Sequence, residues 1–128
     1  MAYILVVEDD TLIREIIESI VKGAGHSVHA VGTGLNALMS ARQRAPDLIL
    51  LDMSLPEMNG YLVARELRTH GSVKDIPILA VTAHDSAEDY DAAYQAGCTG
   101  FLAKPIDDGR LLKAIDEQLK GAKVKGKK

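Results

Sequence analysis

The chain has 128 residues, of which 47% are hydrophobic, with one cysteine and no tryptophan. That length and apolar content fit one globular domain with its own core and leave no room for a second domain. No apolar run approaches the length of a membrane helix, no secretory signal pattern opens the chain, and a lone cysteine forms no internal disulfide. We therefore expect a cytoplasmic protein with no membrane partner.

Charge is distributed unevenly along the chain. The formal net charge is −3, but five lysines and no acid lie in residues 120–128, so residues 1–119 carry −8. An acidic body argues against nucleic acid as a partner, because a basic face supplies most of the affinity for a phosphate backbone. Residues 121–128 have too little apolar content to fold. We expect a domain over residues 1–120 and a basic, disordered tail over 121–128.

The first half of the chain alternates between strand and helix patterns. A continuous apolar run over residues 3–7 predicts a strand buried on both faces of a sheet. A helix follows, with Asp10 or Thr11 as its cap, and two glycines mark its end. Next come a strand over 27–31, a helix over 34–45 that stops before Pro46, and a strand over 47–52. The apolar positions at helical spacing are Leu12, Ile13, Ile16, Ile17, Ile20, Val21 and Ala24 in the first helix, and Leu35, Leu38, Met39 and Ala41 in the second.

The second half repeats this alternation. Residues 54–60 have the proline and Asn-Gly signals of a loop, and the helix after them is expected to turn Leu62, Val63 and Leu67 inward. The remaining predicted elements are a strand over 76–82, a helix capped by Ser86 and running to Gln95, a strand over 99–103, and a helix after Asp107 or Asp108 that buries Leu111, Leu112, Ile115 and Leu119. Five strands and five helices in strict alternation imply an α/β fold, a doubly wound parallel sheet with helices on both faces.

Two of the apolar runs end on carboxylates. Residues 3–7 lead into Glu8, Asp9 and Asp10, and residues 48–51 lead into Asp52. The carboxyl ends of parallel strands meet at one edge of the sheet, which is where ligands bind in such folds. Two carboxylates about 4 Å apart repel by roughly 4 kcal/mol at an effective dielectric of 20. Oxygen ligands in a partly open pocket suit Mg²⁺ (or Mn²⁺), which leaves room for a phosphate, so we predict a metal-dependent phosphoryl site.

Two further strand ends carry suitable groups. The fourth strand ends on Thr82, a hydroxyl that can hydrogen-bond a phosphoryl oxygen, and the fifth is followed by Lys104, a point charge for phosphate. Taken singly, these are an ordinary strand residue and a surface lysine. Their position at the same edge as the acids favours a shared site.

Four segments together resemble the receiver domain of two-component response regulators, the CheY-like family, and the resemblance covers residues 2–120. The segments are VVEDD at 6–10, DLILLDMSLPEMNG at 47–60, VTA at 81–83 and AGCTGFLAKP at 96–105. This resemblance implies a flavodoxin-like sheet of strand order 2-1-3-4-5, an order that periodicity alone does not give.

The resemblance also implies roles for individual residues. Asp52 matches the aspartate that accepts the phosphoryl group, and Glu8 and Asp9 match the acidic pair. By that match Asp9, Asp52 and the backbone carbonyl of Ser54 would bind Mg²⁺ directly, and Glu8 would act through a water. Thr82 and Lys104 match the switch hydroxyl and the phosphate-binding lysine. Phe101 matches the aromatic switch residue, which swings between inward and outward rotamers, and the Lys104–Pro105 bond would be cis.

We accordingly expect a stand-alone, single-domain response regulator. It would accept a phosphoryl group on Asp52 from a histidine kinase or histidine phosphotransfer protein, assisting its own phosphorylation and dephosphorylation rather than acting as an enzyme on other substrates. A downstream target protein would dock on the fourth helix, fifth strand and fifth helix. One alternative is a Mg²⁺-dependent phosphatase of the haloacid dehalogenase type, although its Asp-x-Asp motif after the first strand is replaced here by Glu8-Asp9-Asp10. A flavin-binding module is the other, although three carboxylates after the first strand would repel the flavin phosphate.

Overall fold

A computed structural model describes residues 2–71, 73–84 and 86–126, and strands and helices alternate along them as predicted. The strands are β1 (Tyr3–Val7), β2 (Ser27–Val31), β3 (Leu48–Asp52), β4 (Ile78–Thr82) and β5 (Gly100–Ala103). The helices are α1 (Thr11–Gly23), α2 (Gly34–Gln43), α3 (Gly60–Arg68), α4 (Ala87–Ala96) and α5 (Asp108–Gly126).

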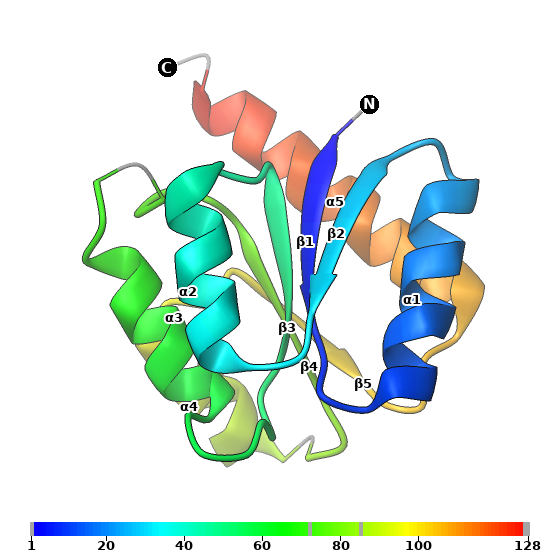
Figure 1. Ribbon diagram of the computed structural model, residues 1–128. Coiled ribbons are helices and arrows are strands. Elements are labelled where there is room, and N and C mark those ends of the chain that lie inside the picture. Colours follow the sequence, from blue (N-terminus) through cyan, green and yellow to red (C-terminus); the bar gives the residue numbers. More distant parts are fainter. Residues whose placement is uncertain (1, 72, 85, 127–128) are drawn as a thin grey trace.

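All five strands run parallel in one sheet of order β2-β1-β3-β4-β5, which confirms the expected order. Figure 1 shows α2, α3 and α4 on one side of the sheet and α1 and α5 on the other. The order of the strands reverses direction between β1 and β3. The carboxyl ends of these two strands are therefore the place where such folds open a crevice for a ligand.

The core has two halves because the strands are buried on both faces. Leu5 and Val7 of β1 pack with α2, α3 and α4, whereas Ile4 and Val6 pack with α1 and α5. β3 repeats this alternation along its whole length, and all five of its residues are buried. A strand enclosed in this way holds the carboxylate at its end in a fixed position.

Side-chain caps fix where the helices begin. Asp10, rather than Thr11, caps α1, with its Oδ1 accepting a hydrogen bond from the Ile13 N–H at 3.0 Å. Ser86 caps α4 in a reciprocal capping box with Asp89. At the start of α5 the Asp107 carboxylate accepts the Arg110 N–H at 3.0 Å. These caps confirm the helix starts that the sequence predicts.

Burial within the helices differs from expectation at several positions. Leu62 is 43% exposed, so its predicted inward position is wrong. The inward-facing stripe of α3 is formed by Val63, Ala64 and Leu67. Leu62 directly precedes the first of these residues, and this places its side chain outside the buried stripe. Among the positions that predicted α1 and α2, the following are also exposed: Leu12, Ile16, Leu35 and Met39.

Several element ends differ by one or two residues. α2 ends at Gln43, two residues before the predicted end, because Arg44 is already extended ahead of Pro46. β4 begins at Ile78 rather than at residue 76. β3 begins at Leu48, and the Asp47 side chain before it accepts the Tyr3 N–H at 2.8 Å.

The helix α5 continues to Gly126, beyond the boundary expected at residue 120. Residues 121–126 contain one alanine and two lysines, which are among the better helix formers, and two glycines, which are poor ones. The division into a domain over 1–120 and a disordered tail over 121–128 stays a prediction, and residues 127–128 lie outside the described residues. Among the helices that the structure describes, none is both long and apolar enough to cross a membrane.

Candidate functional site

The predicted site residues meet at the carboxyl edge of the sheet. Asp52 is the last residue of β3 and Thr82 the last of β4, while Glu8 directly follows β1 and Lys104 directly follows β5. Glu8, Asp52 and Thr82 are 2%, 3% and 1% exposed, whereas Asp9 is open to solvent. The structure thus gathers groups from the ends of four strands into one cluster, which is partly open to solvent at Asp9.

Three carboxylates form the centre of this cluster. Glu8, Asp9 and Asp52 each offer an oxygen, and these oxygens all lie within 4.8 Å of one another. Two buried carboxylates and one exposed one make a hard, oxygen-only ligand set that is open to solvent on one side. This set fits Mg²⁺, which binds one or two carboxylates and retains several waters.

Lys104 is the cation of the site. Its Nζ donates a hydrogen bond to Glu8 Oε1 at 3.0 Å and lies 3.7 Å from Asp52 Oδ2. Burial acts to lower the pKa of Lys104, but the hydrogen bond to Glu8 and the negative charge of Asp52 outweigh it and raise the pKa. The ammonium is therefore charged, and it bridges two of the three acids.

Glu8 has a strongly perturbed pKa. Burial raises the pKa of Glu8 from 4.5 to about 7, the Lys104 hydrogen bond acts against this, and the neighbouring Asp52 adds to it. Without a bound cation, Glu8 therefore holds a proton well above the pH at which an exposed glutamate loses it. A strongly perturbed pKa beside a specific charged partner is typical of functional sites.

This raised pKa gives a pH-dependent stability. The folded protein binds the Glu8 proton more tightly than the unfolded chain does, so the free energy of unfolding falls as the pH rises from about 4.5 to about 7. We expect a loss on the order of 2–3 kcal/mol across this interval, which is absent in Glu8→Gln. Urea denaturation in the presence of EDTA measures it. Equal pH profiles for the parent and Glu8→Gln would contradict the assignment.

The loop after β3 fixes the orientation of the Asp52 carboxylate. The Ser54 N–H donates to Asp52 Oδ1 at 2.9 Å, which leaves Oδ2 on the side of Lys104. Gly60 begins α3 against this loop, where a Cβ atom would lie 2.5 Å from Met53 Cα and 2.7 Å from the Asp52 carbonyl oxygen. Only glycine permits this close approach, which keeps the loop next to the site.

The ends of β4 and β5 are joined by hydrogen bonds. The Thr82 carbonyl accepts the Lys104 N–H at 2.8 Å, and Thr82 Oγ1 accepts the His84 N–H at 3.1 Å. The Lys104–Pro105 peptide bond is cis, as the resemblance implied. A shift at Thr82 is thereby connected directly to the backbone of Lys104.

Phe101 lies on β5, on the side of the sheet that α4 covers. Its ring stacks on Tyr90 of α4, with ring centroids 3.9 Å apart and an angle of 30° between the planes. Phe101 is partly buried against the core at this position. The sequence places Phe101 correctly on the last strand but gives no sign of Tyr90, because the two residues meet only through packing of α4.

Arg14 is a second residue that sequence reasoning missed. Its Nη1 donates to the Glu8 carbonyl at 2.9 Å, which ties α1 to the end of β1 beside the acid pair. The available signal was a base one helical turn after Asp10, on the first turns of the helix that follows the acids. Cys98 has no role here, since it is buried and burial raises the pKa of its thiol to about 12.

Comparison with known proteins agrees with this geometry. The family model described as the response regulator receiver domain matches residues 4–116. The polar-differentiation response regulator DivK of Brucella abortus is 34% identical over 116 residues, which is 91% of this chain and 94% of that protein. The chemotaxis response regulator CheY4 of Vibrio cholerae superposes with a TM-score of 0.89 at 32% identity, covering 93% of this chain and 99% of that one.

A further structural relative bears on the metal. It is the receiver domain of a sensor histidine kinase from Pseudomonas aeruginosa, with a magnesium ion coordinated in its active site cleft. It superposes with a TM-score of 0.86 at 33% identity, covering 92% of this chain and 97% of that one.

Proposed function

The chain belongs to the response regulator receiver domain family, and on that premise we propose that Asp52 accepts the phosphoryl group. Members of this family are phosphoaccepting signalling domains of two-component systems rather than enzymes acting on a separate substrate. The observation that carries the residue assignment is the burial of Asp52 at a strand end between an acid pair and Lys104. Transfer from a phosphohistidine would form a bond from the Asp52 carboxylate to phosphorus and break the phosphorus–nitrogen bond, whose electron pair returns to the imidazole.

The acidic cluster of Glu8, Asp9 and Asp52 is typical of the magnesium site of receiver domains. We assign Asp9, Asp52 and the Ser54 carbonyl as direct ligands of Mg²⁺ (or Mn²⁺), with Glu8 acting through a water. The bound cation would offset the negative charge of the phosphoryl oxygens. Ser54 also serves through its N–H, which orients the Asp52 carboxylate.

Thr82, Lys104 and Phe101 would convert phosphorylation into a change of shape. A phosphoryl group on Asp52 adds about 1.5 to 2 negative charges and strong acceptors. Each charge-assisted hydrogen bond from Lys104 or Thr82 is worth about 1.5–3 kcal/mol, and about 5.5 kcal/mol moves an equilibrium from 1:99 to 99:1. A few such contacts are therefore sufficient to switch the domain.

A receiver domain implies a histidine kinase as its partner. We propose that the phosphodonor is a histidine kinase or a histidine phosphotransfer protein. We also propose that a downstream target protein docks on α4, β5 and α5. Phe101 of β5 supports this surface, because it stacks on Tyr90 of α4, whose ring is partly exposed to solvent.

Labelling by a small phosphodonor tests the proposal. Incubation with acetyl phosphate and Mg²⁺ is expected to add one phosphoryl group, seen by intact mass, and EDTA is expected to prevent this. Steady release of phosphate from small phosphate esters, without a labelled protein, would favour the haloacid dehalogenase type of phosphatase instead.

Lys104 is expected to contribute more to the conformational change after phosphorylation than to the transfer of the phosphoryl group. The reason is that its ammonium must leave Glu8 to reach a phosphoryl group on Asp52. Lys104→Ala should still be labelled by acetyl phosphate but respond poorly. Amide shifts at Thr82 and Phe101 in ¹⁵N NMR spectra measure the response. Shifts as large as in the parent would contradict this role.

A further inference from the structure

The aromatic side chains of this protein are few, and all but Tyr3 of β1 lie on α4 or on the elements packed against it. The chain has four tyrosines and one phenylalanine. Tyr90 and Tyr94 lie one turn apart on α4 and are 39% and 51% exposed. Phe101 stacks on Tyr90, and Tyr61 of α3 is packed against the same half of the core. Two exposed rings on one helix are a large share of the aromatic surface of this chain.

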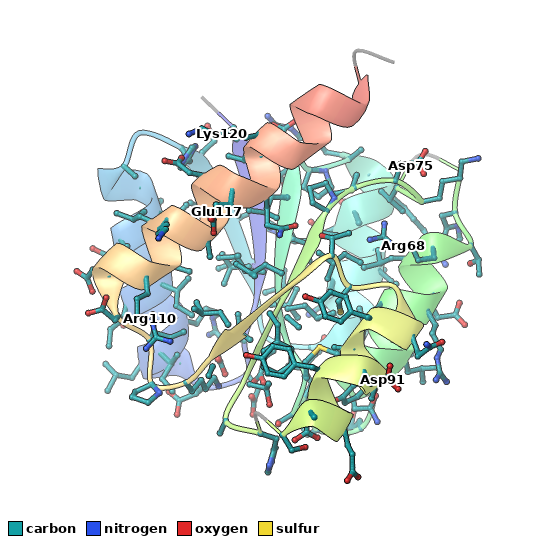
Figure 2. The ribbon with its side chains drawn as sticks, turned by 180° about the vertical axis from the view of Figure 1, so that it is seen from behind. Arg68, Asp75, Asp91, Arg110, Glu117 and Lys120 are labelled. Carbon is teal, nitrogen blue, oxygen red and sulfur yellow. The ribbon has the colours of Figure 1, made fainter. Side chains whose placement is uncertain are left out.

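The rings lie on a helix whose charged residues are all acidic. α4 contains Glu88, Asp89 and Asp91, and no lysine, arginine or histidine occurs in its sequence. Asp89 is engaged in the capping box, and the Ser86 hydrogen bonds lower its pKa. Glu88 and Asp91 are exposed, and the spacing of three from Asp91 to Tyr94 places this carboxylate beside the outer ring. Figure 2 shows Asp91 on the outer side of α4.

We propose that the face of α4 formed by Tyr90, Asp91 and Tyr94 docks an arginine-bearing segment of the target protein. A guanidinium stacks on tyrosine rings, and its donors pair with the Asp91 carboxylate beside them. Tyrosine and arginine are also the residues that dominate the energetics of protein interfaces. The proposal deepens the proposed function, on which it rests, by naming the chemistry of the partner.

Charge and composition select this occupant over others. The first 119 residues carry −8, which repels acidic partners and nucleic acid. The exposed part of α4 has no leucine, isoleucine or methionine, so the face does not suit a partner helix with a wholly apolar stripe. A cationic segment satisfies both the rings and the carboxylates.

The contact between Tyr90 and Phe101 gives the direction of regulation. In this structure Phe101 occupies one side of the Tyr90 ring. If phosphorylation of Asp52 draws Phe101 inward, that side of the ring becomes available to a guanidinium. Phosphorylation should therefore strengthen docking.

Binding of two synthetic peptides tests the proposal. One is a short fluorescein-labelled peptide of alternating arginine and alanine, and the other has citrulline, which keeps the shape but lacks the charge, at every arginine. Anisotropy should show binding of the arginine peptide alone, and ¹⁵N NMR shifts should lie on α4 and β5. Equal binding of both peptides, or shifts spread over the acidic surface or centred on Asp9, would overturn the proposal.

Single-residue variants distinguish the contribution of the tyrosine rings to peptide binding from that of the overall negative charge. Tyr94→Leu and Asp91→Asn are each expected to weaken binding about three- to fivefold, while Tyr94→Phe restores it. Glu15→Gln on α1, which lies on the other side of the sheet from α4, also removes one negative charge and should have little effect. A loss in Glu15→Gln as large as in Asp91→Asn would overturn the proposal, as would a dimer by sedimentation that Tyr94→Leu abolishes, since a second copy would then be the occupant.

Addition of acetyl phosphate distinguishes the two proposals. Tighter peptide binding that Asp52→Ala removes supports both of them. If acetyl phosphate fails to label the protein, the proposed function fails, whereas the ring and charge variants still decide the docking face from basal binding. Labelling that leaves peptide binding unchanged overturns the regulatory direction alone.

Discussion

Asp52→Ala is expected to take up no phosphoryl group from acetyl phosphate and Mg²⁺, whereas the parent takes up one. The reason is that, among the residues that the structure describes, no other carboxylate combines a buried strand end, an orienting N–H from Ser54 and a cation within 4 Å. Glu8 is also buried, but it holds its proton to about pH 7 and hydrogen-bonds Lys104. Intact-mass measurement over time reads the result directly.

The matched control is Asp116→Ala, which removes an exposed aspartate from α5. It should be labelled at the parental rate. Urea denaturation of both variants separates loss of labelling from loss of fold, and Asp52→Ala should remain folded, since it removes a buried carboxylate whose desolvation opposes folding. Labelling of Asp52→Ala at the parental level would refute the assignment.

The sequence predicted the alternation of elements and the edge at which the site lies. Strands that are apolar along their whole length can only be interior, and the polar residue at which each run stops marks its end. This is how Glu8, Asp52, Thr82 and Lys104 were found. Periodicity alone did not place β1 beside β3, and that neighbourhood came from the resemblance to the family.

Contacts made by helix packing could not be predicted in the same way. The Tyr90–Phe101 stack depends on how α4 rotates over β5, which is set by burial of the small residues Ala93 and Ala96. The inward prediction for Leu62 failed for a related reason. Helical spacing identifies a helix, but a shift of one residue in the buried stripe changes which leucine faces solvent.

Asp9→Ala is expected to weaken Mg²⁺ binding by at least about tenfold and nearly to abolish labelling by acetyl phosphate. Asp9 is the exposed member of the acid cluster, so it meets an entering cation first. Under the proposed ligand assignment, its loss would leave Asp52 as the one side chain in direct contact with the metal. Calorimetric titration with Mg²⁺ measures the affinity. Removal of the Asp9 carboxylate also relieves its repulsion with Asp52, so the metal-free variant should be at least as stable as the parent, with a gain of up to about 1 kcal/mol.

Asp10→Ala is the informative control for this prediction, since Asp10 is the next acid along the chain and lies outside the cluster. Asp10 caps α1, so its loss should lower the free energy of unfolding by about 1 kcal/mol while Mg²⁺ binding is largely retained. Asp9→Ala is thus expected to lose Mg²⁺ affinity without losing stability, whereas Asp10→Ala is expected to lose stability while it retains Mg²⁺ affinity. If Asp9→Ala binds Mg²⁺ as tightly as Asp10→Ala does, Asp9 is not a ligand, and the acid pair of the site must be reassigned.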